Sequence, residues 1–100
     1  MPAYLVANVR VTDTSGYASY RRLVQESLRV HGGKVVARGE GRVLEGGGPP
    51  DRTIILEFPD SATLDRWYES DEYRAAKAIR QRTAVSRVIA IEGTDDGPSR

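Results

Sequence analysis

Residues 53–58, Thr-Ile-Ile-Leu-Glu-Phe, are the stretch from which the fold is predicted most directly. The run is rich in β-branched and aromatic side chains and lies between Pro49-Pro50 and Pro59, a pattern typical of a short strand. Side chains alternate between the two faces of a strand. One face would therefore carry only apolar groups, Ile54, Leu56 and Phe58, and the other a mixed set, Thr53, Ile55 and Glu57.

Three further strands are predicted on either side of this run. Residues 3–11 place an apolar set on one face, Leu5, Ala7, Val9 and Val11. Residues 34–45 are expected to form a strand with a bulge or bend at 39–41, because Gly39 and Gly41 interrupt it. The glycine-rich run before residue 51 predicts a hairpin connection, since no helix start or Lys-Ser/Thr follows it as in a phosphate loop. Residues 85–92 form the last predicted strand.

Helices are predicted between these strands. Asp13 is the expected N-cap of a helix over 14–31 that ends at Gly32-Gly33. Its buried stripe falls within a narrow arc, Tyr17, Tyr20, Val24, Leu28 and His31. Asp60 or Ser61 would begin a second helix, and Ser70 a further helical stretch. Their apolar residues are Leu64, Trp67 and Tyr68, followed by Tyr73, Ala76 and Ile79.

The order β-α-β-β-α-β predicts an α+β, ferredoxin-like domain over residues 1–93, with 94–100 as a flexible C-terminal tail. Both helical segments would cover one face of a four-stranded antiparallel sheet. The other face would be open, with Tyr4, Val6, Asn8, Arg10, Thr53, Ile55 and Glu57, which Arg38 could join. Such a face is apolar enough to favour a homodimer through paired sheets, and a monomer with a wetted sheet is the alternative.

Composition excludes several classes of protein. The chain of 100 residues has no cysteine, which excludes disulfides and thiolate metal sites. Its 15 basic and 14 acidic side chains interleave, which argues against a nucleic-acid partner. The start lacks a basic segment, and Asn8 and Arg10 break its apolar run, so neither a signal peptide nor a membrane span is predicted. We expect a cytoplasmic protein.

Short strings along the chain resemble the bacterial domain of unknown function 1330 family, and the resemblance runs from about Ala3 to Gly93. The strings are His31-Gly32-Gly33, Ala37-Arg38-Gly39, Leu44-Glu45-Gly46, Leu56-Glu57-Phe58-Pro59, Trp67-Tyr68-Glu69-Ser70, Tyr73, Arg80 and Ile91-Glu92-Gly93. The resemblance implies a dimeric α+β barrel, with two sheets facing each other and helices outside. It implies no reaction, and activities of other proteins with this fold do not transfer by fold alone. Members of this family often have Pro where this chain has Asp71, and a second Gly where it has Glu40.

Three residues are candidates for catalysis. His31, the only histidine, could act as a general base or could close its helix at the negative end of the helix dipole. Arg38 could grip a substrate carboxylate while Glu57 acts as base, or the two could form an ion pair that locks the dimer. A lone histidine argues against a metal site. No nucleotide fingerprint or phosphate loop is present, and no cofactor is expected.

Four aromatic residues are candidates for ligand binding: Tyr17, Tyr20, Trp67 and Tyr73. With Tyr68 they could line an apolar pocket for a small molecule, although aromatics at this spacing also build ordinary cores. Arg80 and Arg87 are expected to make surface or interface ion pairs. Three functions stay open: a cofactor-independent enzyme acting on a small organic acid or ketone, a non-catalytic metabolite-binding module, and a purely structural dimer.

Overall fold

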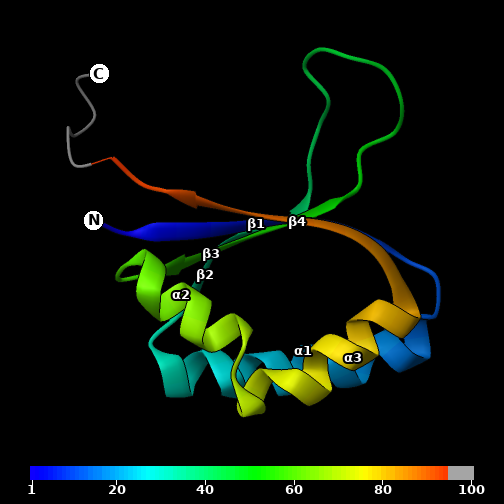
Figure 1. Ribbon diagram of the computed structural model, residues 1–100. Coiled ribbons are helices and arrows are strands. Elements are labelled where there is room, and N and C mark those ends of the chain that lie inside the picture. Colours follow the sequence, from blue (N-terminus) through cyan, green and yellow to red (C-terminus); the bar gives the residue numbers. More distant parts are fainter. Residues whose placement is uncertain (95–100) are drawn as a thin grey trace.

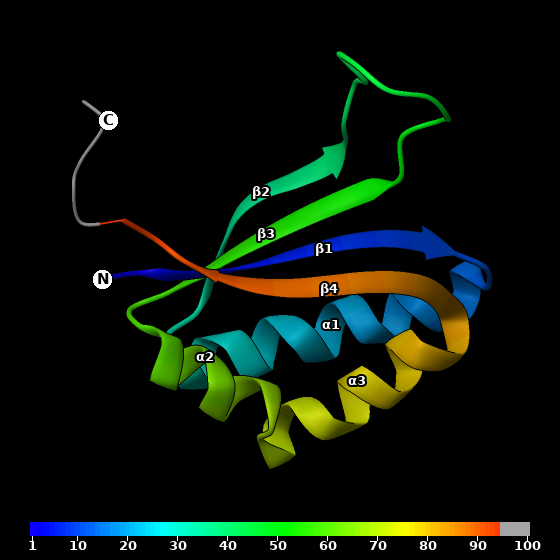
Figure 2. The ribbon, with the colours of Figure 1, turned by 45° about the horizontal axis from the view of Figure 1, so that its top comes forward.

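A computed structural model describes residues 1–94, in which three helices lie against one face of a four-stranded antiparallel sheet (Figure 1). The elements are β1 (Ala3–Val11), α1 (Thr14–His31), β2 (Lys34–Glu40), β3 (Arg52–Phe58), α2 (Ser61–Tyr68), α3 (Asp71–Thr83) and β4 (Ala84–Glu92). The sheet order is β2-β3-β1-β4, as Figure 2 shows. The ferredoxin-like prediction is therefore confirmed. Residues 95–100 of the predicted tail lie outside the described residues.

The helices begin where the sequence predicts. The Asp13 carboxylate accepts a hydrogen bond from the Gly16 amide at 3.2 Å and caps α1. Asp60 caps α2 in the same way, and the Ser70 hydroxyl caps α3. Each cap satisfies an amide that the first helical turn leaves without an intrahelical partner. The chain therefore enters each helix at a defined residue.

Two adjacent glycines end α1 for different physical reasons. Gly32 has φ 75°, the left-handed conformation that side chains with a Cβ rarely adopt, and a Cβ there would have open space around it. Gly33 has ordinary backbone angles, but a Cβ at this position would lie 2.5 Å from the ring of Phe58 and 2.8 Å from Leu28. The first glycine allows the turn, and the second allows the close approach of β2 to the core.

The core lies between the helices and the apolar face of the sheet. It is centred on aromatic rings: the Trp67 ring centroid is 5.2 Å from that of Phe58 and 4.0 Å from that of Tyr73. The indole N–H of Trp67 donates to the Ser27 hydroxyl at 3.0 Å, and that hydroxyl donates to the Val24 carbonyl at 2.9 Å. A buried serine thus satisfies the only polar atom of the indole and ties α1 to α2.

Strand β2 differs from the prediction. It ends at Glu40 and not at residue 45, and its irregularity lies between Val35 and Ala37 and not at 39–41. Val35 is opposite Leu56 and Ala37 is opposite Ile55, so Val36 is an extra residue in the ladder. Side chains after Val36 consequently alternate out of step with those before it.

We call the face of the sheet opposite the helices the open face. It carries three cross-strand rows of side chains. The central row is apolar, Ile55–Val6–Ile89, and the flanking rows are Glu57–Tyr4–Ile91 and Thr53–Asn8–Arg87. The connection 41–51 extends away from the helices on this side, and each of its residues is exposed (Figure 1).

Candidate functional site

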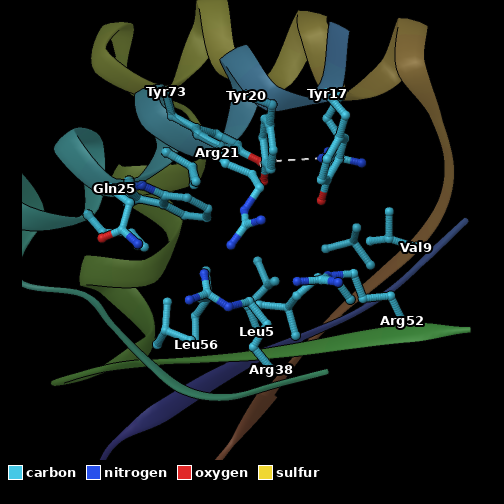
Figure 3. A pocket seen from close by; sticks show the side chains of 18 residues that line it. Leu5, Val9, Tyr17, Tyr20, Arg21, Gln25, Arg38, Arg52, Leu56 and Tyr73 are labelled. Atoms are coloured by element: carbon cyan, nitrogen blue, oxygen red, sulfur yellow. Dashed lines mark hydrogen bonds between the residues drawn. The ribbon is translucent and has the colours of Figure 1, made fainter. Parts of the chain in front are cut away.

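A small pocket lies between α1 and the sheet and encloses a cavity of about 50 Å³ (Figure 3). Apolar side chains of the core face of the sheet, among them Leu5, Ile54 and Leu56, form its floor. Tyr17 and Tyr20 of α1 form its roof. A water molecule needs roughly 10–15 Å³ measured in this way, so the cavity has room for a few waters or for a small ligand.

Four arginines line this pocket, whose remaining lining residues are mostly apolar. Arg21 comes from α1, Arg38 from β2, Arg52 from β3 and Arg80 from α3. In Figure 3 the side chains of Arg21, Arg38 and Arg52 converge on the space between helix and sheet. Within residues 1–94, no aspartate or glutamate lines the pocket, and none of the four arginines pairs with a carboxylate. The pocket therefore concentrates positive charge without an internal counter-charge.

Two phenols and one guanidinium form a hydrogen-bonded group at the helical side of the pocket, which we call the inner cluster: Tyr20, Tyr73 and Arg80. The hydroxyls of Tyr20 and Tyr73 are 3.0 Å apart, and Nε of Arg80 donates to the Tyr73 hydroxyl at 3.4 Å. Burial, together with the Tyr73 hydroxyl, raises the pKa of Tyr20. Burial likewise raises the pKa of Tyr17. Tyr17 and Tyr20 are consequently protonated at neutral pH and can donate hydrogen bonds.

The aromatic residues predicted for ligand binding do meet in one place. Tyr17, Tyr20, Trp67 and Tyr73 all line the pocket. The ring centroid of Tyr68 is 5.8 Å from that of Tyr73, but Tyr68 does not line the pocket, and the Lys77 ammonium lies 4.3 Å from the centroid of its ring. Whether the four aromatic residues bind a ligand stays a prediction, because they also form part of the core.

Arg38 and Glu57, predicted to share the open face, lie on opposite faces of the sheet. Arg38 is opposite Ile54 and lines the pocket, whereas Glu57 is on the open face with its Oε1 atom 3.7 Å from Nζ of Lys34. The predicted Arg38–Glu57 pair is thus wrong. The physical reason is the extra residue Val36, which turns Arg38 toward the helices.

His31 lies away from both groups. It is the last residue of α1, and its Nε2 atom is 2.6 Å from Oε1 of Glu72 in the first turn of α3. This hydrogen bond lowers the pKa of Glu72. His31 does not line the pocket. The three residues predicted for catalysis, His31, Arg38 and Glu57, therefore occupy three separate places.

Sequence reasoning missed the arginines of the pocket other than Arg38. Arg80, expected in a surface or interface ion pair, is only 6% exposed and pairs with no carboxylate of residues 1–94. Its spacing from Tyr73 and Ala76, seven and four residues, places it on the buried face of α3 and could have identified it. Arg52 likewise continues the alternation of Ile54 and Leu56 toward the helices. Arg87, by contrast, is exposed on the open face.

The described part of the chain shows neither a metal-binding cluster nor a membrane-spanning helix. No group of three histidine, aspartate or glutamate side chains there could hold a metal ion. No helix within residues 1–94 is long and apolar enough to cross a membrane.

Comparison with known proteins assigns the family. A model of the domain of unknown function DUF1330 matches residues 2–94. The chain belongs to the DUF1330 family. Among curated proteins, none matches this DUF1330 chain significantly. The family carries no assigned reaction, so the geometry of the pocket has to suggest a function.

Solved structures similar to this DUF1330 chain share its fold. RPA0582 of Rhodopseudomonas palustris, of unknown function, is 28% identical, with a TM-score of 0.77 and coverage of 94% of this chain and 83% of that one. A dimeric ferredoxin-like protein of unknown function from Jannaschia sp. CCS1 is 12% identical, with a TM-score of 0.75 and coverage of 93% and 100%. SnoaB of Streptomyces nogalater, a cofactor-independent oxygenase, is 11% identical, with a TM-score of 0.62 and 98% coverage of both chains.

Proposed function

We propose that this protein is a homodimer that binds a small organic acid in the pocket between α1 and the sheet. The observation that carries the proposal is the set of four arginines in an apolar pocket that no acidic side chain of residues 1–94 lines. Arg80 is buried and Arg52 half-buried, whereas Arg21 and Arg38 are exposed. Like charges that converge on one pocket repel one another, and a bound anion relieves that repulsion. A carboxylate is the anion that fits best, because the planar guanidinium group holds it through two parallel hydrogen bonds.

The rest of the pocket suits the hydrocarbon part of such an acid. Leu5, Ile54 and Leu56 provide an apolar floor, and the ring of Tyr17 provides part of the roof. Ligand pockets typically combine an apolar lining with a few polar groups that orient the ligand. The size of the cavity favours a short acid over a fatty acid.

Binding is better supported than proton-transfer catalysis. Neither His31 nor Glu57, the two candidate bases, lines the pocket, and burial raises the pKa of Tyr17 and of Tyr20 there, which makes these two phenols poorer bases. A base for a reaction in this pocket would have to come from outside the lining formed by residues 1–94. SnoaB shares the fold with a TM-score of 0.62 at 11% identity, which does not transfer its oxygenase activity.

The open face supports the homodimer. Its central row, Ile55–Val6–Ile89, is apolar, and Ile89 is about half exposed in the single chain. The flanking rows supply Glu57 at one side and Arg87 at the other, so a two-fold rotation can bring opposite charges together. The Jannaschia protein of this fold is dimeric.

The homodimer is tested with Ile55→Lys, which places an unpaired charge in the central row. Val30→Lys is the matched control, because Val30 is exposed on α1 and lies outside the open face. Light scattering should show a dimer for the wild type and for Val30→Lys, and a monomer for Ile55→Lys. A wild-type chain that is monomeric, or an Ile55→Lys variant that stays dimeric, would refute the assembly.

Binding is tested by thermal unfolding of the full chain with a series of short carboxylates, followed by titration calorimetry of those that stabilise it. A ligand present at a hundred times its dissociation constant stabilises the folded state by about 2.7 kcal/mol. Arg21→Gln should weaken binding at least about tenfold, since it removes one charged donor. Arg22→Gln, which changes an exposed neighbour outside the pocket lining, should bind like the wild type. Equal affinities for both variants, or no carboxylate binding, would contradict the proposal.

A further inference from the structure

The inner cluster has more hydrogen-bond donors than its own acceptors can satisfy. Only one hydroxyl proton is used between Tyr20 and Tyr73, whichever phenol donates. Nε of Arg80 donates to the Tyr73 oxygen, which uses one N–H of the guanidinium. One phenol O–H and the four N–H groups on the Nη atoms of Arg80 are left over. The cluster thus presents donors that an acceptor in the pocket can use.

Arg80 adds a fixed positive charge to these donors. The residue is 6% exposed, it lines the cavity, and it pairs with no carboxylate within residues 1–94. A guanidinium stays charged at every accessible pH, so it cannot escape desolvation by losing its proton. A buried charge of this kind is expected to be compensated by hydrogen bonds or by an opposite charge. The neighbour that accepts its hydrogen bond, the Tyr73 hydroxyl, is neutral.

The inner cluster is on the opposite side of the pocket from two of the other arginines. Tyr20 and Tyr73 reach in from the helical layer, whereas Arg38 and Arg52 rise from the sheet (Figure 3). The apolar floor and the cavity lie between these two groups. A ligand whose carboxylate sits with the sheet arginines would therefore direct its other end toward the inner cluster.

We infer that the inner cluster is a second polar subsite, so that the ligand is a short organic acid with a second acceptor oxygen, either a carbonyl or another carboxylate. This inference rests on the proposed function and narrows it to a class of ligand. The free phenol O–H and the Arg80 N–H groups donate to the second oxygen, while the arginines of the sheet hold the first carboxylate. A plain alkyl acid leaves those donors without a partner and binds more weakly.

The experiment compares three acids with the same number of carbons by titration calorimetry on the full-length protein: butyrate, 2-oxobutyrate and succinate. We expect 2-oxobutyrate or succinate to bind at least about tenfold more tightly than butyrate, the difference that a hydrogen bond to a charged or buried donor typically makes. The acid that gains identifies the second oxygen as a carbonyl or a carboxylate.

Two phenol variants locate the effect. The double variant Tyr20→Phe/Tyr73→Phe removes both hydroxyls of the inner cluster and should reduce the preference, by weakening the binding of 2-oxobutyrate or succinate more than that of butyrate. Tyr68→Phe is the control, since Tyr68 does not line the pocket, and it should keep the preference. If all three acids bind equally, or if the double variant keeps the full preference, the second subsite is refuted and the proposed function stands. If none of the acids binds, the proposed function itself fails.

Discussion

Replacement of Gly33 by alanine separates crowding in the core from backbone strain. The new Cβ atom would lie 2.5 Å from Cε2 of Phe58 and 2.8 Å from Cδ2 of Leu28, both shorter than any ordinary carbon–carbon contact. The Phe58 ring is only 1% exposed and packs against Trp67, so it has no free space into which to move. Overpacking of this kind typically costs about 1–3 kcal/mol. We expect Gly33→Ala to lose that amount.

The neighbouring variant Gly32→Ala is the control, because its cost has another origin. Gly32 has φ 75° with open space around a Cβ, so alanine there suffers only the strain of the left-handed conformation, about 1–2 kcal/mol. The two variants can therefore lose similar stability for unrelated reasons. Only the Gly33 variant should depend on what occupies position 58.

Urea unfolding at a single protein concentration measures this dependence through a double-mutant cycle. Phe58→Leu removes part of the ring that the new methyl group of Gly33→Ala would strike. The loss in the double variant should therefore be smaller than the sum of the single losses by at least about 0.5 kcal/mol. Gly32→Ala combined with Phe58→Leu should be additive. Additive losses in both cycles would show that Gly33 is not required by the approach of Phe58, and the reasoning would be wrong.

Further predictions concern the core and one helix cap. Phe58→Ala should destabilise the fold by about 3–5 kcal/mol in chemical denaturation, and a loss below about 1 kcal/mol would mean that β3 faces the other way. Trp67→Phe should cost about 1–3 kcal/mol, because it removes volume and the N–H that Ser27 accepts; an unchanged midpoint would contradict this role. Hydrogen bonds from Thr63 lower the pKa of Asp60 below 3.8, so its contribution to stability is complete above pH 3.8 and lost as pH falls through the lowered pKa. Asp60→Asn keeps a capping side chain but should flatten the acid part of the plot of stability against pH. An unaltered slope in that plot would contradict the role of the Asp60 carboxylate.

Much of the fold could be predicted because local signals and periodicity agree. Asp13, Ser70 and the glycines after His31 mark helix ends through chemistry that acts within a few residues, and the structure confirms them. The alternation in 53–58 placed Leu56 and Phe58 in the core, where they are buried. Such signals do not depend on distant parts of the chain.

The candidate site was harder to predict because it depends on register and on the partner of each charge. A bulge next to Val36 has no distinctive residue, whereas Gly39 and Gly41 are the usual sign of one, so the irregularity was expected at the wrong end of β2. Arg80 was expected at the surface because charged residues are seldom buried, although its helical spacing pointed inward. The first error put Arg38 on the wrong face of the sheet, and the second put Arg80 at the surface. As a result, the positive charge of the pocket was not predicted.

The extra residue in β2, Val36, makes one position of the strand tolerant of deletion. Ala37 pairs with Ile55 and Arg38 with Ile54 while Val36 stands outside the ladder. Loss of the codon for Val36 would join Val35 directly to Ala37 in regular alternation, with the same partners on β3 as before. Deletion of this one codon is therefore expected to be nearly silent for the pocket. Loss of the codon for Val35 would give the same amino-acid sequence, because Val35 and Val36 are adjacent and identical.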